Sequence, residues 1–185
     1  MIIETDGLAS PIGTVVLAVY GGRLCALGFR EYWPRLERVL RRRFTHVTFQ
    51  RRGDHGRIIG RLRSYFRGDL AALDSIPLDL GGTAFQQTVW TRLRAIPVGQ
   101  TISYRDLAAA IGASAAVRAV GAANGANPVS IVVPCHRVIG ADGALTGYGG
   151  GIARKQWLLA HEGALTSDAP RTSGRASCGP GHRSN

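Results

Sequence analysis

Cys135 is the residue whose type and neighbours suggest chemistry most directly, because it stands in the run Pro134-Cys135-His136-Arg137-Val138. The thiolate is a strong nucleophile, and an adjacent base or cation lowers the pKa of a thiol from about 8.5. His136 and Arg137 are neighbours of these two kinds. A lone cysteine beside an apolar run is also a common inert core residue, so both interpretations of Cys135 stay open at this point.

A catalytic imidazole needs a third group that orients it. Residues 81–165 contain only Asp106, Asp142 and Glu162 as acids. Asp142 lies in a glycine turn and Asp106 suits a helix cap, so both have structural explanations. Glu162 ends a helix, where its charge is unfavourable beside the last carbonyls. This favours Glu162 as the partner of His136.

The segments around Cys135 should be a buried strand and a glycine loop. Ile131-Val132-Val133 predicts the strand, and Pro134 ends it because proline has no backbone donor. Neighbouring residues on a strand point to opposite faces, so His136 is expected to reach Cys135 across a turn or through a bridging water. Residues 147–151, Gly-Tyr-Gly-Gly-Gly, have the backbone freedom to close over a flat ligand. A phosphate-binding loop is the alternative for so many glycines, but no GxxxxGK[ST] pattern accompanies them.

Three helices with a helix-turn-helix outline should position these segments. Thr83 predicts the N-cap of the first, and Ser103 predicts the N-cap of the second, which ends at Gly112. The third covers residues 115–124 and is rich in alanine and glycine. The expected apolar face of the first helix is Phe85, Val89, Trp90 and Leu93.

The third helix has too few polar side chains to read bases in the major groove, since Arg118 and Asn124 are its only candidates. Small residues allow close backbone approach, either to another helix or to a narrow groove. Helix packing is one interpretation. The other is docking in a DNA minor groove without sequence preference, with Arg118 protruding.

The first eighty residues read as a small α/β unit with no catalytic constellation, so we expect a structural domain. Gly81-Gly82 marks the predicted boundary. The expected elements are a hairpin of residues 13–20 and 24–29, a helix over 36–43, a strand over 47–49 and a helix over 58–66 that Gly68 ends.

Composition limits the class of protein. With 185 residues, 45% hydrophobic and 19% charged, the chain is neither disordered nor long enough in any apolar run to span a bilayer. Three cysteines without a CxxC pair argue against a disulfide framework and against a structural zinc site, and no secretory signal is present, so we expect a cytoplasmic protein. The net charge of +11 suits a polyanion, but the excess is spread along the chain and does not decide the partner.

Several motifs together resemble the O6-alkylguanine-DNA alkyltransferases, also called methylated-DNA–protein-cysteine methyltransferases. The similarity covers residues 83–163 in family order, and the first eighty residues resemble the family's N-terminal domain only in outline, most like its bacterial constitutive members. From Thr166 onward nothing matches. The motifs are Phe85-Gln86-Gln87-Thr88-Val89-Trp90, Ile96-Pro97-Val98-Gly99, Ser103-Tyr104, Arg118-Ala119-Val120-Gly121, Asn127-Pro128, Pro134-Cys135-His136-Arg137-Val138, Gly147-Tyr148-Gly149-Gly150-Gly151 and Trp157-Leu158-Leu159-Ala160-His161-Glu162-Gly163.

The resemblance implies an α/β (α+β) fold in two domains and a tail. Residues 1–80 would be a small sheet-plus-helix domain, RNase H-like. Residues 81–165 would be a mostly helical, winged helix-turn-helix-like alkyltransferase domain that binds DNA. Residues 166–185, rich in Ser, Gly, Pro and Arg, predict a disordered tail in which Cys178 is a bystander thiol.

The resemblance also implies a reaction. Cys135 would take an alkyl group, above all methyl, from O6 of guanine in DNA, with O4 of thymine as a further expected donor. The thioether would be permanent, so each molecule would act once. Glu162, His136 and a water would form the relay that produces the thiolate, and Asn127 would brace the turn around the cysteine. Tyr104 would donate to guanine N3.

The remaining implied residues surround the base and the duplex. The carbonyls of Cys135 and Val138 would accept from the exocyclic amine, and the pocket would include Tyr148, Val138, Gly149 and Arg137. The implied DNA-binding residues are Arg118, Tyr104, Ala119, Ala122 and Asn124, with Arg118 entering the stack from the minor groove in place of the flipped base. Asn124 stands where some relatives have a larger apolar residue, so a more polar pocket rim is expected.

The implied partner is double-stranded DNA that carries O6-alkylguanine, bound by a monomer without a cofactor, a metal or a membrane. Two other classes of protein fit the sequence less well. A helix-turn-helix protein that only binds DNA conflicts with the poverty of base-reading side chains and with Cys135. A Cys–His–Glu hydrolase usually has its base far from the nucleophile in sequence, whereas His136 is adjacent.

Overall fold

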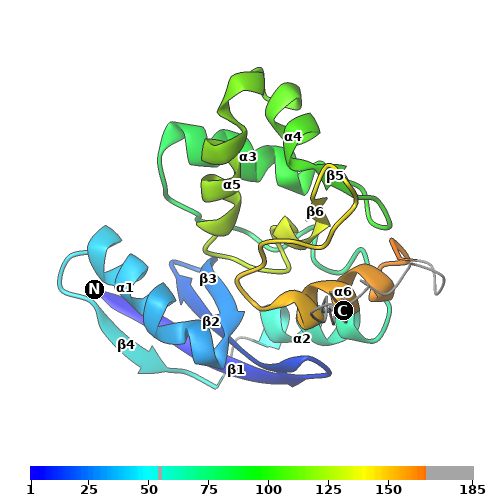
Figure 1. Cartoon of the computed structure of the whole chain (residues 1–185). Coiled ribbons are helices and arrows are strands. Elements are labelled where there is room, and N and C mark those ends of the chain that lie inside the picture. Colours follow the sequence, from blue (N-terminus) through cyan, green and yellow to red (C-terminus); the bar gives the residue numbers. More distant parts are fainter. Residues whose placement is uncertain (54–55, 166–185) are drawn as a thin grey trace, which may run out of the picture.

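The computed structural model describes residues 1–53 and 56–165, and the predicted tail with Cys178 lies outside this part of the chain. Its elements are, in chain order, β1 (Ile2–Ser10), β2 (Gly13–Tyr20), β3 (Arg23–Phe29), η1 (Arg30–Tyr32), α1 (Trp33–Arg43), β4 (Thr48–Arg51), α2 (Gly56–Phe66), α3 (Ala84–Arg94), β5 (Ile102–Ser103), α4 (Tyr104–Ala110), η2 (Ser114–Ala116), α5 (Val117–Gly125), η3 (Cys135–Arg137), β6 (Val138–Ile139) and α6 (Ile152–His161), where η marks a 3-10 helix. The fold is a mixed α/β arrangement (Figure 1).

A four-stranded sheet in the order β3-β2-β1-β4 forms the N-terminal part. The first three strands are antiparallel and β4 runs parallel to β1. The predicted hairpin is confirmed, and Gly21 and Gly22 both take the positive φ that a tight turn between twisted strands requires. The long strand β1 was not predicted. Its Glu4, Asp6 and Gly7 are poor strand formers, and pairing with β2, and for Glu4 also with β4, overrides that preference.

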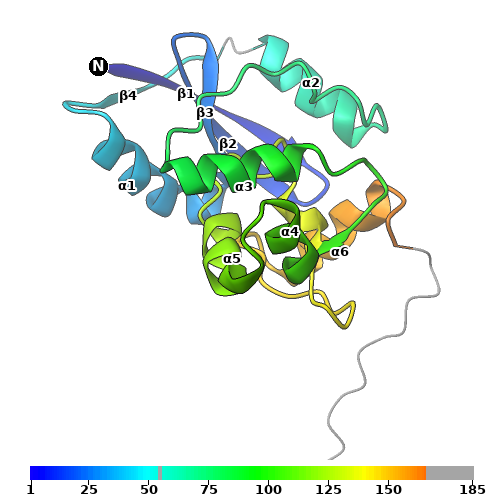
Figure 2. The same ribbon diagram turned by 90° about the horizontal axis from the view of Figure 1, so that it is seen from above.

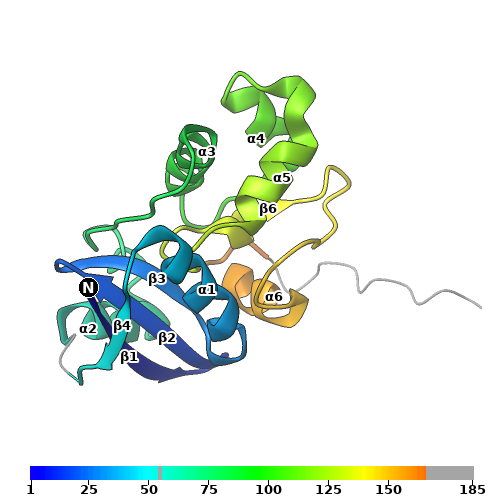
Figure 3. The same ribbon diagram turned by 90° about the vertical axis from the view of Figure 1, so that its left-hand side faces the viewer.

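The two faces of the sheet are covered by one helix each (Figure 3). Side chains alternate along β2, so Leu17 and Val19 point into one apolar cluster and Ala18 points into another. The first cluster includes Ile58 and Leu62 of α2, and the second includes residues of α1, as expected from their apolar spacing. The sheet is therefore buried on both sides.

Helices α3, α4 and α5 stack beside the sheet (Figure 2), and their predicted N-caps are confirmed. The Thr83 hydroxyl accepts from the backbone of Gln86, whose side chain accepts in return. The Ser103 hydroxyl accepts from the backbone N–H of Asp106 at 3.0 Å. The expected apolar face of α3 is wrong at one position, because Phe85 is 37% exposed.

The strand predicted for Ile131-Val132-Val133 is wrong. Ile131 and Val132 form a buried turn, Ile131 takes a φ of 74°, and only an isolated bridge joins Ser130 to Val133. An apolar run indicates that a segment is buried. In so short a run, the periodicity of apolar residues cannot distinguish a strand from a packed turn. Cys135 accordingly begins the 3-10 helix η3 and does not end a strand.

The apolar core runs without a break from the sheet into the helical part. Leu27 of β3 donates to the carbonyl of Pro128 at 2.9 Å and accepts from Ser130 at 2.8 Å, which ties the turn before Cys135 to the sheet edge. Buried residues of α2, α3, α5 and α6 belong to one cluster. The predicted boundary at Gly81-Gly82 stays a prediction. No helix in residues 1–53 and 56–165 has the length and apolar character needed to cross a bilayer.

Candidate active site

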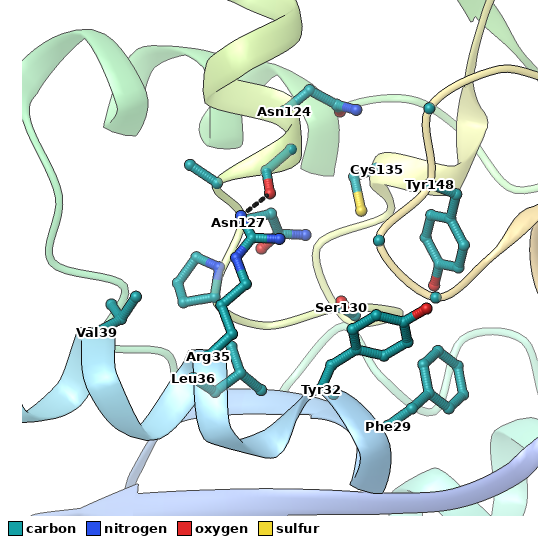
Figure 4. Close-up of a pocket in the computed structure, with 17 residues that line it drawn as sticks. Phe29, Tyr32, Arg35, Leu36, Val39, Asn124, Asn127, Ser130, Cys135 and Tyr148 are labelled. Carbon is teal, nitrogen blue, oxygen red and sulfur yellow. Dashed lines mark hydrogen bonds between the residues drawn. The ribbon is translucent and has the colours of Figure 1, made fainter.

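Cys135 lies at the inner end of a cavity of about 100 Å³ between the helical part and the N-terminal sheet. Its side chain is 6% exposed, so a reagent reaches it only through this space. In Figure 4 the sulfur points into the cavity between Asn127 and Tyr148, with Tyr32 across from it. The thiol therefore faces a partly enclosed pocket.

Asn127 fixes the turn that carries the thiol. Its Nδ2 donates to the carbonyl of Val133 at 2.8 Å, and its Oδ1 accepts from the N–H of Val129 at 3.0 Å. The side chain thus satisfies two backbone groups across the buried turn, where an unpaired group would be costly. The brace expected of Asn127 is present.

His136 and Glu162 are hydrogen bonded, with His136 Nε2 3.0 Å from Glu162 Oε1. Both side chains are fully buried. Burial lowers the pKa of His136, more than the glutamate raises it, so the imidazole is neutral. Because the carboxylate can only accept, Nε2 carries the proton and Nδ1 is left as a free acceptor. Nδ1 is buried and has no partner within the described residues.

Glu162 is the centre of a wider network. Arg137 donates to it twice, at 2.7 and 3.0 Å, and the Tyr65 hydroxyl donates at 2.8 Å. Burial alone would raise the pKa of Glu162, but the hydrogen bonds from His136 and Arg137 outweigh it and lower the pKa to about 2. The carboxylate is therefore ionised. Its donors compensate for the unfavourable place of a negative charge at the C-cap of α6, as the sequence predicted.

The expectation that Arg137 activates the thiol and lines the pocket is wrong. Its guanidinium is occupied by Glu162 and by the carbonyl of Ile96 at 2.6 Å, and it does not line the Cys135 cavity. Burial instead raises the pKa of Cys135, while the hydrogen bond from Asn127 and the charge of Lys155 oppose that rise. The resting thiol is neutral, because desolvation in the core exceeds the help of its neighbours.

Lys155 is the cation that the structure places near the thiol. It is fully buried in α6, and its Nζ donates to the carbonyls of Val138 at 2.5 Å and Thr146 at 2.6 Å. Burial lowers the pKa of Lys155 to about 8. Lys155 was not singled out from the sequence, although a signal existed, since it is the only lysine beside 22 arginines.

Tyr148 and Gly149 line the cavity as expected, whereas Val138 does not. Burial raises the pKa of Tyr148 well above its ordinary value, so its hydroxyl keeps its proton. The carbonyl of Val138, expected to accept from the base, already accepts from Lys155. Tyr104 is not among the residues that line the cavity, and its hydroxyl lies 3.4 Å from the carbonyl of Gly147.

The predicted DNA-binding residues of α5 fall on two sides of the helix. Arg118, Ala119 and Ala122 are exposed and form an outer face with one long side chain. Asn124 points inward, is 2% exposed and lines the cavity. The exposed small residues would let a nucleic-acid backbone approach closely.

Comparison with known proteins identifies the family of the chain. Residues 84–164 match the family model described as 6-O-methylguanine DNA methyltransferase, DNA binding domain. The methylated-DNA–protein-cysteine methyltransferase of Salmonella typhimurium is 49% identical over 163 residues, which cover 86% of this chain and 95% of the relative. The chain belongs to this methyltransferase family. The Mycobacterium tuberculosis member is 50% identical over 150 residues, 81% of this chain and 86% of the relative.

Solved structures of the family agree. The O6-methylguanine methyltransferase of M. tuberculosis has a TM-score of 0.73 and 45% identity, covering 90% of this chain and 96% of its own. A second structure of the mycobacterial protein, in complex with DNA, has a TM-score of 0.73 and 46% identity over 87% of this chain and 93% of its own. The methyltransferase fold therefore extends over both parts of the chain.

In this methyltransferase the N-terminal part contributes to the wall of the Cys135 cavity. Phe29, Tyr32, Arg35, Leu36 and Val39 complete the cavity wall and precede the residues matched by the family model. No sequence motif pointed to them, because they reach the site only where β3, η1 and α1 meet the end of α5, to which Arg35 donates at the carbonyl of Gly125.

Arg154 holds the glycine loop to the N-terminal part. Its guanidinium donates to the carbonyls of Ile12 at 2.7 Å and Gly150 at 3.1 Å, pairs with Glu31 at 2.5 Å and lies over the ring of Phe29. A Cβ at Gly150 would lie 2.5 Å from Phe29, so only glycine permits this close approach. Among residues 1–53 and 56–165, no three His, Cys, Asp or Glu side chains are grouped to hold a metal ion.

Proposed function

We propose that this protein repairs DNA by transferring an alkyl group from O6 of guanine to Cys135, once per molecule. The observation that carries the proposal is a buried thiol that faces a small cavity and is followed in the chain by His136, whose neutral imidazole is paired with Glu162. The sulfur attacks the alkyl carbon, the O6–carbon bond breaks, and a thioether forms. A thioether is not readily cleaved by water, and within the described residues no second thiol lines the cavity, which supports a single transfer. The Cys135 thiol must stay reduced to react, and thiols stay reduced in the cytoplasm, so we place the reaction there. O4-alkylthymine is a second candidate substrate.

Because the thiol is neutral at rest, its proton must leave as the sulfur attacks. Nδ1 of His136 is the proposed acceptor, since Nε2 already donates to Glu162. A bridging water between Sγ and Nδ1 would carry the proton. Glu162, ionised at neutral pH, then stabilises the imidazolium. Tyr104 is the proposed donor to the ring of the departing guanine, because burial raises the pKa of its hydroxyl and keeps it protonated.

The proposed partner is double-stranded DNA, bound through the minor groove by a monomer without strong sequence preference. An O6-alkyl group in a stacked base cannot reach a cavity that closes around Cys135, so the base must be flipped out. Arg118 is the side chain proposed to fill the gap, since it is the long exposed residue on a face with Ala119 and Ala122. In this proposal α4 and α5 act as a helix-turn-helix unit of the winged type, and the sheet with its α1 crossover is RNase H-like.

The test is stoichiometric labelling. The full chain is incubated with excess duplex DNA that carries isotopically labelled methyl on guanine O6, and peptides are then mapped. We expect one label per protein, on Cys135, and none with Cys135→Ser. Cys25→Ala is the matched control and should keep full labelling, because burial raises the pKa of Cys25 to about 11 and its side chain lies in the core. Label on another residue, or release of methyl with continuing turnover as a hydrolase would give, would contradict the proposal.

A further inference from the structure

We infer that Tyr65, a residue of the N-terminal part, is a positioning residue for the reaction, because it holds Glu162 behind His136; this rests on the proposed function. Tyr65 lies on α2 and its side chain is fully buried. Its hydroxyl donates to Glu162 Oε1 at 2.8 Å, and the same oxygen lies 3.0 Å from His136 Nε2. The hydroxyl and the imidazole therefore share one acceptor atom, although they come from distant parts of the sequence.

Tyr65 also contacts the end of α6 through its backbone and its ring. Its carbonyl accepts from Nε2 of His161 at 2.8 Å, and the two rings pack edge-on with their centroids 5.1 Å apart. Because a carbonyl can only accept, Nε2 of His161 carries a proton, and the neutral and charged forms of this imidazole both supply it. Tyr65 thus binds two neighbouring residues, His161 and Glu162, and fixes the position of the Glu162 carboxylate.

The Tyr65 hydroxyl does not act as an acid or a base itself. Burial and then the negative charge of Glu162 raise the pKa of Tyr65 far above its ordinary value, so the hydroxyl stays a donor at every pH of interest. Tyr65 is not among the residues that line the Cys135 cavity. Its influence on the reaction therefore passes through Glu162.

Sharing Oε1 has two physical consequences for His136. The hydroxyl keeps Oε1 where it accepts from Nε2, which leaves Nδ1 of His136 as the free acceptor. A hydrogen bond to a carboxylate also stabilises its charge, so Glu162 attracts an imidazolium less strongly. The hydroxyl of Tyr65 therefore helps to keep His136 neutral, in the form that can take the proton of the thiol.

A pH profile must separate His136 from the groups around it. The charged and titratable groups that face His136, Glu162 and Tyr65 are Cys135, Arg137, Tyr148, Lys155 and His161. Burial raises the pKa of the thiol and of the Tyr148 phenol, and the arginine stays charged, so none of these titrates below neutral pH. The pKa of Lys155, about 8, lies on the other side of neutrality. Replacing Tyr65 by phenylalanine keeps the carbonyl and ring that contact His161, so a changed acid limb reports on the hydroxyl.

The experiment is the pH dependence of methyl transfer by the full chain of Tyr65→Phe, which removes only the hydroxyl. The ring already packs in the apolar core and Glu162 keeps its bonds to His136 and Arg137, so the variant should fold. The rate with limiting methylated duplex DNA, which reports the groups of the free protein, is followed by intact mass between about pH 5 and pH 7.5. Wild type should lose rate as the pH falls through the pKa of His136. The variant should lose it roughly half to one pH unit higher, and should be about tenfold slower at pH 7 because the carboxylate is less firmly placed.

Tyr20→Phe is the matched control, because Tyr20 lies on β2 beside the other apolar cluster of the sheet. Its rate and acid limb should match those of wild type. The final amount of label on Cys135 counts the folded, active molecules in each sample, so the rates are compared among these alone. An acid limb of Tyr65→Phe that stays in place would show a merely structural role and overturn the inference, and so would an equal shift in Tyr20→Phe. Either result leaves the proposed function standing, whereas an unlabelled Cys135 in wild type would refute the function itself.

Discussion

Replacing Glu162 by glutamine tests the electrostatics of the site most severely. The carboxylate accepts from His136, twice from Arg137 and from Tyr65, and its side chain is fully buried. Glutamine keeps the shape but removes the charge and turns one oxygen into a donor. The Arg137 guanidinium then remains buried without a counter-ion.

The magnitude follows from the pKa. Glu162 falls from an ordinary value of 4.5 to about 2, and this difference corresponds to about 3 kcal/mol at 1.36 kcal/mol per pKa unit. Because the folded pKa is depressed, this stabilisation is fully present above pH 4.5 and is lost as the pH falls toward 2. Breaking a buried pair costs about 3–5 kcal/mol, against a total stability of about 5–15 kcal/mol, so the variant should fold at pH 7.

The assay is urea unfolding of both proteins from pH 7 down to pH 2. Wild type should lose about 3 kcal/mol more than Glu162→Gln between pH 4.5 and pH 2. Glu37→Gln is the control, since its pair with Arg41 is exposed on α1 and should be worth less than about 1 kcal/mol. Parallel pH curves for wild type and Glu162→Gln would refute the assignment of a buried, ionised glutamate.

Two further substitutions test the cation and the DNA contact. Lys155→Met should slow methyl transfer at pH 7 about tenfold or more, because two carbonyls lose a charged donor and the thiol loses a positive charge that favours its ionised form. The pH–rate profile should lose the break near 8 that titration of Lys155 gives wild type, and an unchanged profile would contradict this. Arg118→Ala should weaken repair of duplex DNA about tenfold, with much less effect on a free O6-alkylguanine base. Arg92→Ala is the control, because Arg92 is an exposed arginine of α3. Equal losses on both substrates would count against base flipping by Arg118.

Local signals in the sequence predicted the helical scaffold well. The caps at Thr83 and Ser103, the glycine turn at residues 21–22 and the partnership of His136 with Glu162 all depend on residues near in sequence or on a charge that needed explanation. The pairing of His136 with Glu162 was accessible because few acids were available to choose from.

What the sequence could not predict depends on packing between distant segments. Nothing near Lys155 indicates that its ammonium group reaches the carbonyls of Val138 and Thr146. Tyr65 donates to Glu162 from a helix 97 residues earlier in the chain. The sequence also misled at Arg137, because adjacency to Cys135 suggested a contact, whereas the turn of η3 directs the guanidinium to the other side.

The charges of the site argue for one coordinated step and against a preformed thiolate. Burial raises the pKa of Cys135 and lowers that of His136, so a separated thiolate–imidazolium pair is disfavoured before substrate arrives. Once sulfur bonds to the alkyl carbon it is neutral again, and the only new charges are on the imidazolium beside Glu162 and on the departing base near Tyr104. Burial therefore suppresses reaction of Cys135 with unrelated electrophiles, and only a ligand that takes up the negative charge lets the proton move to His136.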